Sequence, residues 1–185
     1  MSDRVRLRPA HDEASLARIY ARPHNHTKWL DHKVRVAVTA QFTDVLAGQV
    51  ETAADLSCGD GTILNALNAK AKYFGDYAPG YALTGMIDDT IEQIPVVDLF
   101  ICCETIEHLD DPDATLARIR SKAKTLVLST PVDAFGDTNP EHYWAFSRDG
   151  VERMLADAGF TVLFYTAIDC RPARGEYQFG VWYCR

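Results

Sequence analysis

Short apolar segments alternate with segments of helical periodicity over most of this chain, and this alternation restricts its fold more than any other feature. Apolar segments span residues 51–56, 72–74, 96–103, 125–129, 161–166 and 179–183, and helices are predicted at 63–71, 114–123 and 149–158. Several of the strands are apolar throughout, which is typical of parallel strands covered on both faces. The last two strands have only a turn-rich segment between them, which favours an antiparallel hairpin. We therefore predict an α/β fold with a mostly parallel sheet, a C-terminal antiparallel hairpin and helices on both faces.

Two helices are predicted before the first strand. Residues 12–21 form a short helix that Asp12 opens and Pro23 ends. Between residues 29 and 46 an apolar residue recurs every three or four positions, which indicates one face of an amphipathic helix; these residues are Leu30, Val34, Val38, Phe42 and Val45. A length of 185 residues fits one domain. We expect residues 1–48 to form a helical cap and residues 49–185 to form a ligand-binding core.

The composition excludes several classes of protein. Five cysteines without a C-x-x-C pair argue against a disulfide framework and a zinc knuckle. No segment approaches the ~18 apolar residues of a membrane span, and the first residues lack the apolar core of a secretory signal. We therefore expect a cytoplasmic protein that does not bind membranes. A net charge of −7 argues against a broad electrostatic surface for nucleic acid.

The loop after the first strand of the predicted core is built for close approach to a ligand. Ser57, Gly59 and Gly61 allow a tight turn, and the helix that follows directs its N–H groups toward the same place. A glycine turn alone is equally consistent with an ordinary strand–helix connection. Asp76, however, ends the next apolar segment 21 residues after Asp55 (76 − 55), where a carboxylate can accept the two hydroxyl groups of a ribose.

Nicotinamide-dependent dehydrogenases share this geometry and are the first alternative. Their third glycine is missing here, because residue 64 is Leu. With Asp55 and Cys58 in the turn, the loop fits an amino-acid sulfonium better than a pyrophosphate, and Asp55 is placed to hold an ammonium group.

These motifs together resemble the class I S-adenosylmethionine-dependent methyltransferases over about residues 45–183. The resemblance rests on residues 55–61, Phe74-Gly75-Asp76, the segment Glu104-Thr105-Ile106-Glu107-His108-Leu109, Ser129-Thr130-Pro131 and Glu141-His142-Tyr143-Trp144. Ser57 departs from the family pattern, which has a glycine there. The resemblance implies a Rossmann-like seven-stranded sheet and S-adenosylmethionine as cofactor. The residues it implies for cofactor binding are Asp55, Ser57, Cys58, Gly59, Asp60, Gly61, Asp76, Tyr77, Ile87, Asp88 and Glu104.

The segment after the fourth strand carries the pattern E-x-x-E-H. Residues three and four apart share one face of a helical turn, so Glu104, Glu107 and His108 can converge, and His142 can add a fourth ligand. This donor set suits Mg²⁺, Mn²⁺ or Fe²⁺ better than structural zinc. The alternative is a structural role without metal. The pattern is similar to that of ubiquinone-pathway O-methyltransferases and of small-RNA 3′-terminal 2′-O-methyltransferases, which implies a metal-assisted transfer to one of two adjacent oxygens.

We expect methyl transfer to an oxygen of a small molecule, with His108 or His142 as the base where no metal binds. The alternatives are a 2′-O-methyltransferase acting on an RNA 3′ end and a non-catalytic domain that binds S-adenosylmethionine. An RNA end would need a basic strip, for which the candidates are Arg148, Arg153, Arg171 and Arg174. The sequence leaves the oligomeric state open.

The remaining histidines and aromatic residues allow two interpretations. His24, His26 and His32 fit surface or lid positions better than a metal site. Tyr20, His26 and Trp29 can form a lid over a sulfonium, or Trp29 can pack its helix onto the sheet. Three aromatic residues after His142 can line an acceptor pocket: Tyr143, Trp144 and Phe146. Alternatively, Trp144 and Phe146 can belong to the core.

Overall fold

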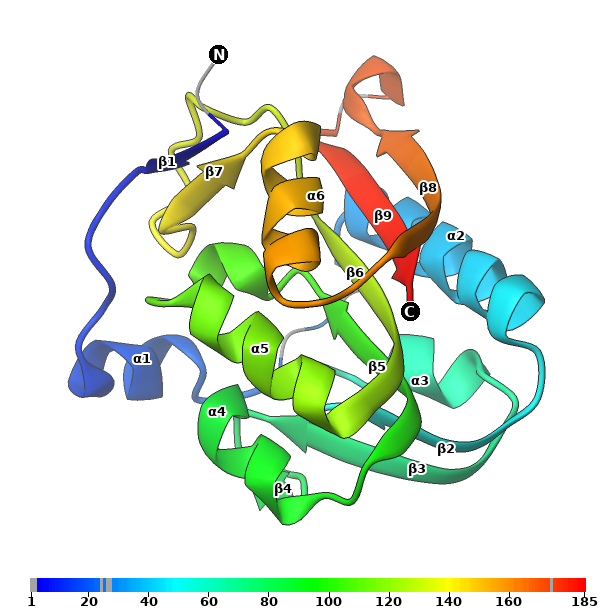
Figure 1. Cartoon of the computed structure of the whole chain (residues 1–185). Coiled ribbons are helices and arrows are strands. Elements are labelled where there is room, and N and C mark those ends of the chain that lie inside the picture. The colour runs from blue at the N-terminus through cyan, green and yellow to red at the C-terminus, as the bar shows by residue number, and fades with distance from the viewer. Residues whose placement is uncertain (1–2, 24, 26–27, 174) are drawn as a thin grey trace.

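The computed structural model describes residues 3–23, 25, 28–173 and 175–185. Its main sheet has seven strands in the order β4-β3-β2-β5-β6-β9-β8. The first five strands in that order are parallel, and β9 is antiparallel to both of its neighbours. The predicted α/β fold, with its antiparallel C-terminal hairpin, is therefore confirmed (Figure 1). The seven strands are β2 (Val50–Asp55), β3 (Ala69–Asp76), β4 (Leu83–Thr84), β5 (Val97–Cys103), β6 (Ala123–Pro131), β8 (Val162–Asp169) and β9 (Gln178–Cys184).

Helices cover both faces of the sheet, with one buried apolar cluster on each side (Figure 1). On one face lie α4 (Ile87–Thr90), α5 (Pro112–Lys122) and α6 (Arg148–Asp157), with the short 3₁₀ helices η1 (Ile91–Gln93) and η2 (Ile106–His108). The other face carries α2 (Leu30–Ala47) and α3 (Thr62–Ala66). Because β2, β3, β5 and β6 are parallel, the loops that follow them open at the same edge of the sheet, where ligands bind in such folds.

The N-terminal segment closes over this edge. It contains β1 (Arg4–Arg6) and α1 (Glu13–Ile19). Asp12 caps the start of α1, as predicted, because its carboxylate accepts a hydrogen bond from the Ser15 amide. β1 pairs antiparallel with β7 (Trp144–Phe146) in a separate two-stranded sheet that the sequence did not predict. A last 3₁₀ turn, η3 (Arg171–Ala173), lies in the β8–β9 connection.

The predicted helix over residues 63–71 is wrong in its second half. α3 ends at Ala66, and β3 begins at Ala69, which pairs with Val50 of β2. Alanine and lysine in this segment favour a helix, but pairing with β2 overrides that local preference.

The helix predicted over residues 29–46 exists as α2, yet most of its predicted apolar face is exposed, and of the five predicted residues only Phe42 packs against the core. The apolar positions Leu30 and Val45 are 55% and 70% exposed. The residues buried against the sheet are mostly polar: Asp31, Arg35, Val36, Thr39 and Thr43. Arg35 is fully buried with its guanidinium over the Phe179 ring, and Thr43 Oγ1 donates to the Thr39 carbonyl, so polar contacts accompany the apolar contact that Val36 makes with the core. Among the described residues, no helix is long and apolar enough to cross a membrane.

Gly150 in α6 docks the N-terminal segment. A Cβ at this position would lie 1.9 Å from the Asp3 carbonyl oxygen, which accepts a hydrogen bond from the Ser147 amide. We expect Gly150→Ala to push residue 3 and β1 away from α6, at a cost of about 1–3 kcal/mol. Hydrogen exchange of the β1 amides, together with urea denaturation, measures both effects. Gly136→Ala is the control, since nothing lies within 4 Å of a Cβ there; unchanged exchange in Gly150→Ala would contradict the prediction.

Candidate active site

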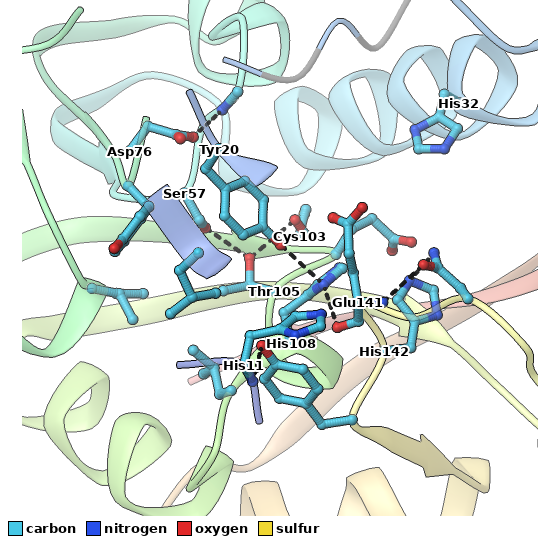
Figure 2. Close-up of a pocket in the computed structure, with 18 of the residues that line it drawn as sticks. His11, Tyr20, His32, Ser57, Asp76, Cys103, Thr105, His108, Glu141 and His142 are labelled. Carbon is cyan, nitrogen blue, oxygen red and sulfur yellow. Dashed lines mark hydrogen bonds between the residues drawn. The ribbon is translucent and has the colours of Figure 1, made fainter. Parts of the chain in front are cut away.

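A cavity of about 770 Å³ opens at the carboxyl edge of the parallel strands. Its wall combines the loops after β2, β3 and β5 with the N-terminal segment and with residues 139–143 and 175–179. Figure 2 shows that histidine, tyrosine and carboxylate side chains from distant parts of the chain point toward one another there. This volume falls in the range of small-molecule sites, roughly 300–1,000 Å³.

The loop after β2 is held by its own hydrogen bonds and by β3. The Asp60 carboxylate accepts from the Thr62 amide at 3.1 Å, and Gly61 adopts a left-handed conformation (φ 73°) that favours glycine. The Cys58 amide donates to the Gly75 carbonyl at 3.0 Å, which ties the loop to β3.

Asp76 lies directly beside the glycine loop, as its spacing predicts. One carboxylate oxygen accepts from the Gly59 amide at 2.7 Å and the other from the Ala78 amide at 2.8 Å. A carboxylate offers about four acceptor positions, so both oxygens retain capacity for hydroxyl groups in the cavity.

The residues predicted to bind the cofactor divide into two sets. Those on the cavity wall are Ser57, Gly59, Asp76, Tyr77, Ile87 and Glu104. Within the described chain, five others lie outside that wall: Asp55, Cys58, Asp60, Gly61 and Asp88. Cofactor binding by the residues of both sets stays a prediction.

Asp55 lies beneath the loop and not in the cavity wall. It is buried and accepts a hydrogen bond from the Ser57 amide at 3.1 Å. Burial raises the pKa of Asp55 to about 7, against the opposing effect of that amide. Asp88 is turned toward α5, where it accepts from Thr115 Oγ1 at 2.9 Å and lies 3.8 Å from Arg118.

Glu104 adopts a left-handed backbone conformation (φ 53°), which is uncommon outside glycine and often marks functional sites. Its carboxylate accepts from Ser129 Oγ at 2.9 Å and lies 4.0 Å from the Arg35 guanidinium. Burial raises the pKa of Glu104, while Arg35 acts in the opposite direction. The preceding residue, Cys103, also lines the cavity, and burial raises the pKa of its thiol to about 12.

Three of the four predicted metal ligands come together. Glu107, His108 and His142 each offer one ligand atom within 4.8 Å of the others, and the two imidazole rings lie 4.7 Å apart at 85°. Glu104 is not part of this cluster among the described residues, so the four-ligand set stays a prediction.

Hydrogen bonds orient both histidines of the cluster. His108 Nδ1 lies 2.9 Å from the Glu141 carbonyl, which only accepts, so Nδ1 carries the hydrogen and Nε2 carries the lone pair. His142 Nδ1 lies 2.5 Å from the Asp137 carboxylate, which assigns the same tautomer. The His142 Nε2 lone pair faces the Asn139 amide nitrogen at 3.1 Å. Each ring therefore carries its lone pair on Nε2, the nitrogen that could bind a metal or accept a proton, and in His142 that lone pair accepts a hydrogen bond from the Asn139 amide.

Glu107 holds an unsatisfied buried oxygen next to these rings. Its Oε2 accepts from Thr130 Oγ1 at 2.9 Å, whereas Oε1 has no hydrogen-bond partner among the described residues and lies 3.9 Å from His108 Nε2. Burial, reinforced by the Glu104 carboxylate, raises the pKa of Glu107 to about 8. The unsatisfied Oε1 lies beside the His108 Nε2 lone pair, and a divalent cation there would satisfy both. His142 could add a third ligand once the Asn139 amide moves aside.

The supporting residues were missed in the sequence. Asp137 accepts hydrogen bonds from His142 and Tyr177, which lowers its pKa despite partial burial. Burial alone would lower the pKa of His142, but Asp137 and the neighbouring carboxylates outweigh it and raise that pKa. The spacing Asp137-x-Asn139-x-x-His142 is a short local signal that could have indicated this group. Arg35 could not have been found from its helix, because its neighbours at helical spacing, Asp31 and Thr39, are polar, a pattern typical of a solvent-exposed face.

The far side of the cavity carries the residues considered for an acceptor. Tyr143 lines it, and its hydroxyl accepts from the His11 amide at 3.0 Å, whereas Phe146 is fully buried in the core. Tyr20 lies edge-on to Tyr77, and burial together with the Glu141 carboxylate raises its pKa. The Trp144 indole donates to the Leu109 carbonyl, so Trp144 packs against the segment that follows η2.

The predicted lid is described only in part. Tyr20, Trp29 and His32 line the cavity. His24 and His26 lie outside the described residues.

Comparisons with known proteins support a fold and no closer relationship. No protein-family model and no curated protein matches this chain. Many solved structures share its fold, and three of them illustrate the likeness. The N-methyltransferase NodS from Bradyrhizobium japonicum WM9, in complex with S-adenosylhomocysteine, is 16% identical over 93% of this chain and 96% of its own, with a TM-score of 0.70.

The 1,6-didemethyltoxoflavin-N1-methyltransferase from Burkholderia thailandensis, with bound S-adenosylhomocysteine, is 14% identical over 98% of this chain and 92% of its own, with a TM-score of 0.72. The magnesium protoporphyrin IX methyltransferase from Synechocystis PCC 6803 is 12% identical over 84% and 83%, with a TM-score of 0.60. The chain therefore has the class I fold of S-adenosylmethionine-dependent methyltransferases.

Burial of Glu107 should make the folded protein less stable as the pH rises from 4.5 toward 8, because folding then requires the carboxyl to take up a proton. The pKa of Glu107 rises from 4.5 to about 8 on folding. The Glu107 carboxyl therefore contributes to the free energy of unfolding below pH 4.5, and this contribution is lost as the pH rises through 8. We expect Glu107→Gln to raise the free energy of unfolding by about 1–3 kcal/mol at pH 8, with little gain at pH 5. Urea denaturation at the two pH values measures this.

Glu92→Gln provides the comparison, since the Glu92 side chain is 56% exposed and pairs only with surface cations among the described residues. Its stability should change little at either pH. A loss of stability at pH 8 in Glu107→Gln would show that the charged form is satisfied within the protein.

Proposed function

We propose that this chain is an S-adenosylmethionine-dependent methyltransferase that methylates an oxygen of a small molecule. The observation that carries the proposal is the position of two groups on one cavity. The Gly59–Asp76 pair lies at one end, and the Glu107–His108–His142 cluster lies beside the other. A ribose-binding pair and a proton-accepting cluster in one cavity fit a donor and an acceptor side by side.

The donor end of the cavity has the chemistry that an adenosyl group requires. Asp76 would hold the ribose hydroxyls, and Ser57 and Gly59 leave the backbone accessible. Tyr77, Met86 and Ile87 provide an apolar wall for a purine. When bound, S-adenosylmethionine supplies an already activated methyl group.

The work left to the protein is to orient the acceptor, exclude water and remove a proton. His142 Nε2 is the base we assign, because Asp137 stabilises the imidazolium that proton uptake creates, and the Asn139 amide that now donates to Nε2 would give way to the acceptor. His108, held by the Glu141 carbonyl, is the second base candidate. Leu16 and Tyr20 from the N-terminal segment cover the cavity and limit the access of water.

A divalent cation, Mg²⁺, Mn²⁺ or Fe²⁺, fits the Glu107–His108–His142 cluster. Bound there, it would lower the pKa of an acceptor oxygen. Two imidazoles and one carboxylate favour Mn²⁺ or Fe²⁺ over Mg²⁺, which prefers oxygen ligands.

The charges around the cavity favour a small molecule over an RNA end. The described wall contains several carboxylates, including Glu104, Glu141 and Glu176, and no lysine or arginine. Phosphate groups would need such cations. The arginines considered for RNA pair elsewhere: Arg148 with Glu152, Arg153 with Asp3 and Arg171 with Asp169; Arg174 lies outside the described residues.

Donor binding tests the first half of this proposal. We expect Asp76→Ala to weaken S-adenosylhomocysteine binding by about 10-fold to 100-fold, because it removes charge-assisted hydrogen bonds to the ribose. Isothermal titration calorimetry measures the affinity, and Asp157→Ala on exposed α6 serves as the control. Binding of NAD in place of S-adenosylhomocysteine would instead identify a dehydrogenase.

Metal binding tests the second half. We expect the wild-type protein to bind Mn²⁺ in electron paramagnetic resonance titrations, and His108→Ala or His142→Ala to weaken binding about 10-fold or more. His11→Ala is the matched control, because His11 lines the same cavity outside the cluster. Equal Mn²⁺ affinity in all four proteins would leave the two histidines as bases without metal.

A further inference from the structure

Helix α2 presents an apolar stripe to the solvent. Four of its residues are among the exposed large hydrophobic side chains, from 37% exposed at Val34 to 70% at Val45. At 100° per residue the stripe covers an arc of about 100°. It consists of Leu30, Val34, Ala37, Val38, Gln41 and Val45, with glutamine as its only polar member.

This stripe is unusual because the opposite face of the helix is polar and buried. Arg35, Thr39 and Thr43 have no exposed surface, so the helix cannot be rotated to bury its valines without exposing the Arg35 group beside Glu104. The sequence therefore maintains an apolar surface that the fold does not use. Contiguous apolar surface of this kind often marks an interaction site.

Charges beside the stripe indicate what covers it. Lys33 and Asp44 lie on the same flank, 11 residues apart (44 − 33), which is about 16 Å along the helix. Neither forms an ion pair with another residue that the structure describes in this chain. A partner that pairs with both side chains must place an anion opposite Lys33 and a cation opposite Asp44.

We propose that α2 packs antiparallel against α2 of a second copy of this chain, about a two-fold axis near Val38. In an antiparallel pair the same flanks face each other, so Lys33 of each copy lies opposite Asp44 of the other. The same register seats Val34 between Gln41 and Val45 of the second copy. In a parallel pair, the flank that carries Lys33 and Asp44 would instead face the opposite flank of the second helix, and neither charge would meet its counterpart.

The contact would also reach the cavity. Leu30 belongs to the stripe and, with its neighbour Trp29, to the cavity wall. Association would therefore cover the start of α2 and support that wall. This inference does not depend on the methyltransferase proposal, because it rests on α2 alone.

Charge reversal tests the antiparallel contact. Sedimentation velocity of the full chain at about 5–200 µM should show a concentration-dependent dimer. Lys33→Glu and Asp44→Lys should each weaken dimerisation about tenfold or more, because each places like charges opposite one another. An equimolar mixture of the two variants should form a heterodimer in native mass spectrometry, and the double variant Lys33→Glu/Asp44→Lys should recover the homodimer.

Asp157→Lys, the same charge change on exposed α6, is the control and should leave the dimer unchanged. Val34→Glu/Val38→Glu should give a monomer, with circular dichroism confirming that it remains folded. A wild-type chain that stays monomeric throughout overturns the proposal. So does a dimer that survives the charge reversals, as expected if the copies associate through edge strand β8 with its exposed Leu163 and Phe164.

Discussion

The hydrogen bond from the Gly59 amide to the Asp76 carboxylate is the contact on which the rest of the cavity depends. It joins the loop after β2 to the end of β3, and the bond from Cys58 to Gly75 reinforces the same connection. The carboxyl ends of β2 and β3 lie at the same edge of the sheet because these neighbouring strands are parallel. The carboxylate thereby already lies beside accessible backbone, and such preorganisation lowers the cost of ordering a ligand.

The second half of the cavity depends on buried polar groups that hold one another. Asp137 orients His142, the Glu141 carbonyl orients His108, and Thr130 satisfies one oxygen of Glu107. These partners come from separate segments, yet among the described residues Glu107 Oε1 has no hydrogen-bond partner and lies 3.9 Å from His108 Nε2. Natural proteins retain such costly groups mainly where function needs them.

The sequence predicted the fold because the local signals agreed with the tertiary structure. Apolar segments marked the strands, and the 21-residue separation of Asp55 and Asp76 correctly placed Asp76 beside the loop. The predictions failed where distant contacts decide the structure: Ala69 joins a strand because β2 pairs with it, and α2 turns Arg35 inward because Glu104 and Phe179 are there. The E-x-x-E-H pattern brought Glu107 and His108 together with His142, but no spacing could reveal that Glu104 faces Arg35.

Cys103 ends β5 on the cavity wall, where burial keeps its sulfur protonated at neutral pH. A sulfonium donor is an alkylating agent, and the species that it would attack is the thiolate. A protein that confines such a reagent beside a cysteine risks alkylating itself. If the cavity holds the sulfonium donor that we propose, the burial of Cys103 suppresses the reactive anion and so limits alkylation of the protein by its own donor.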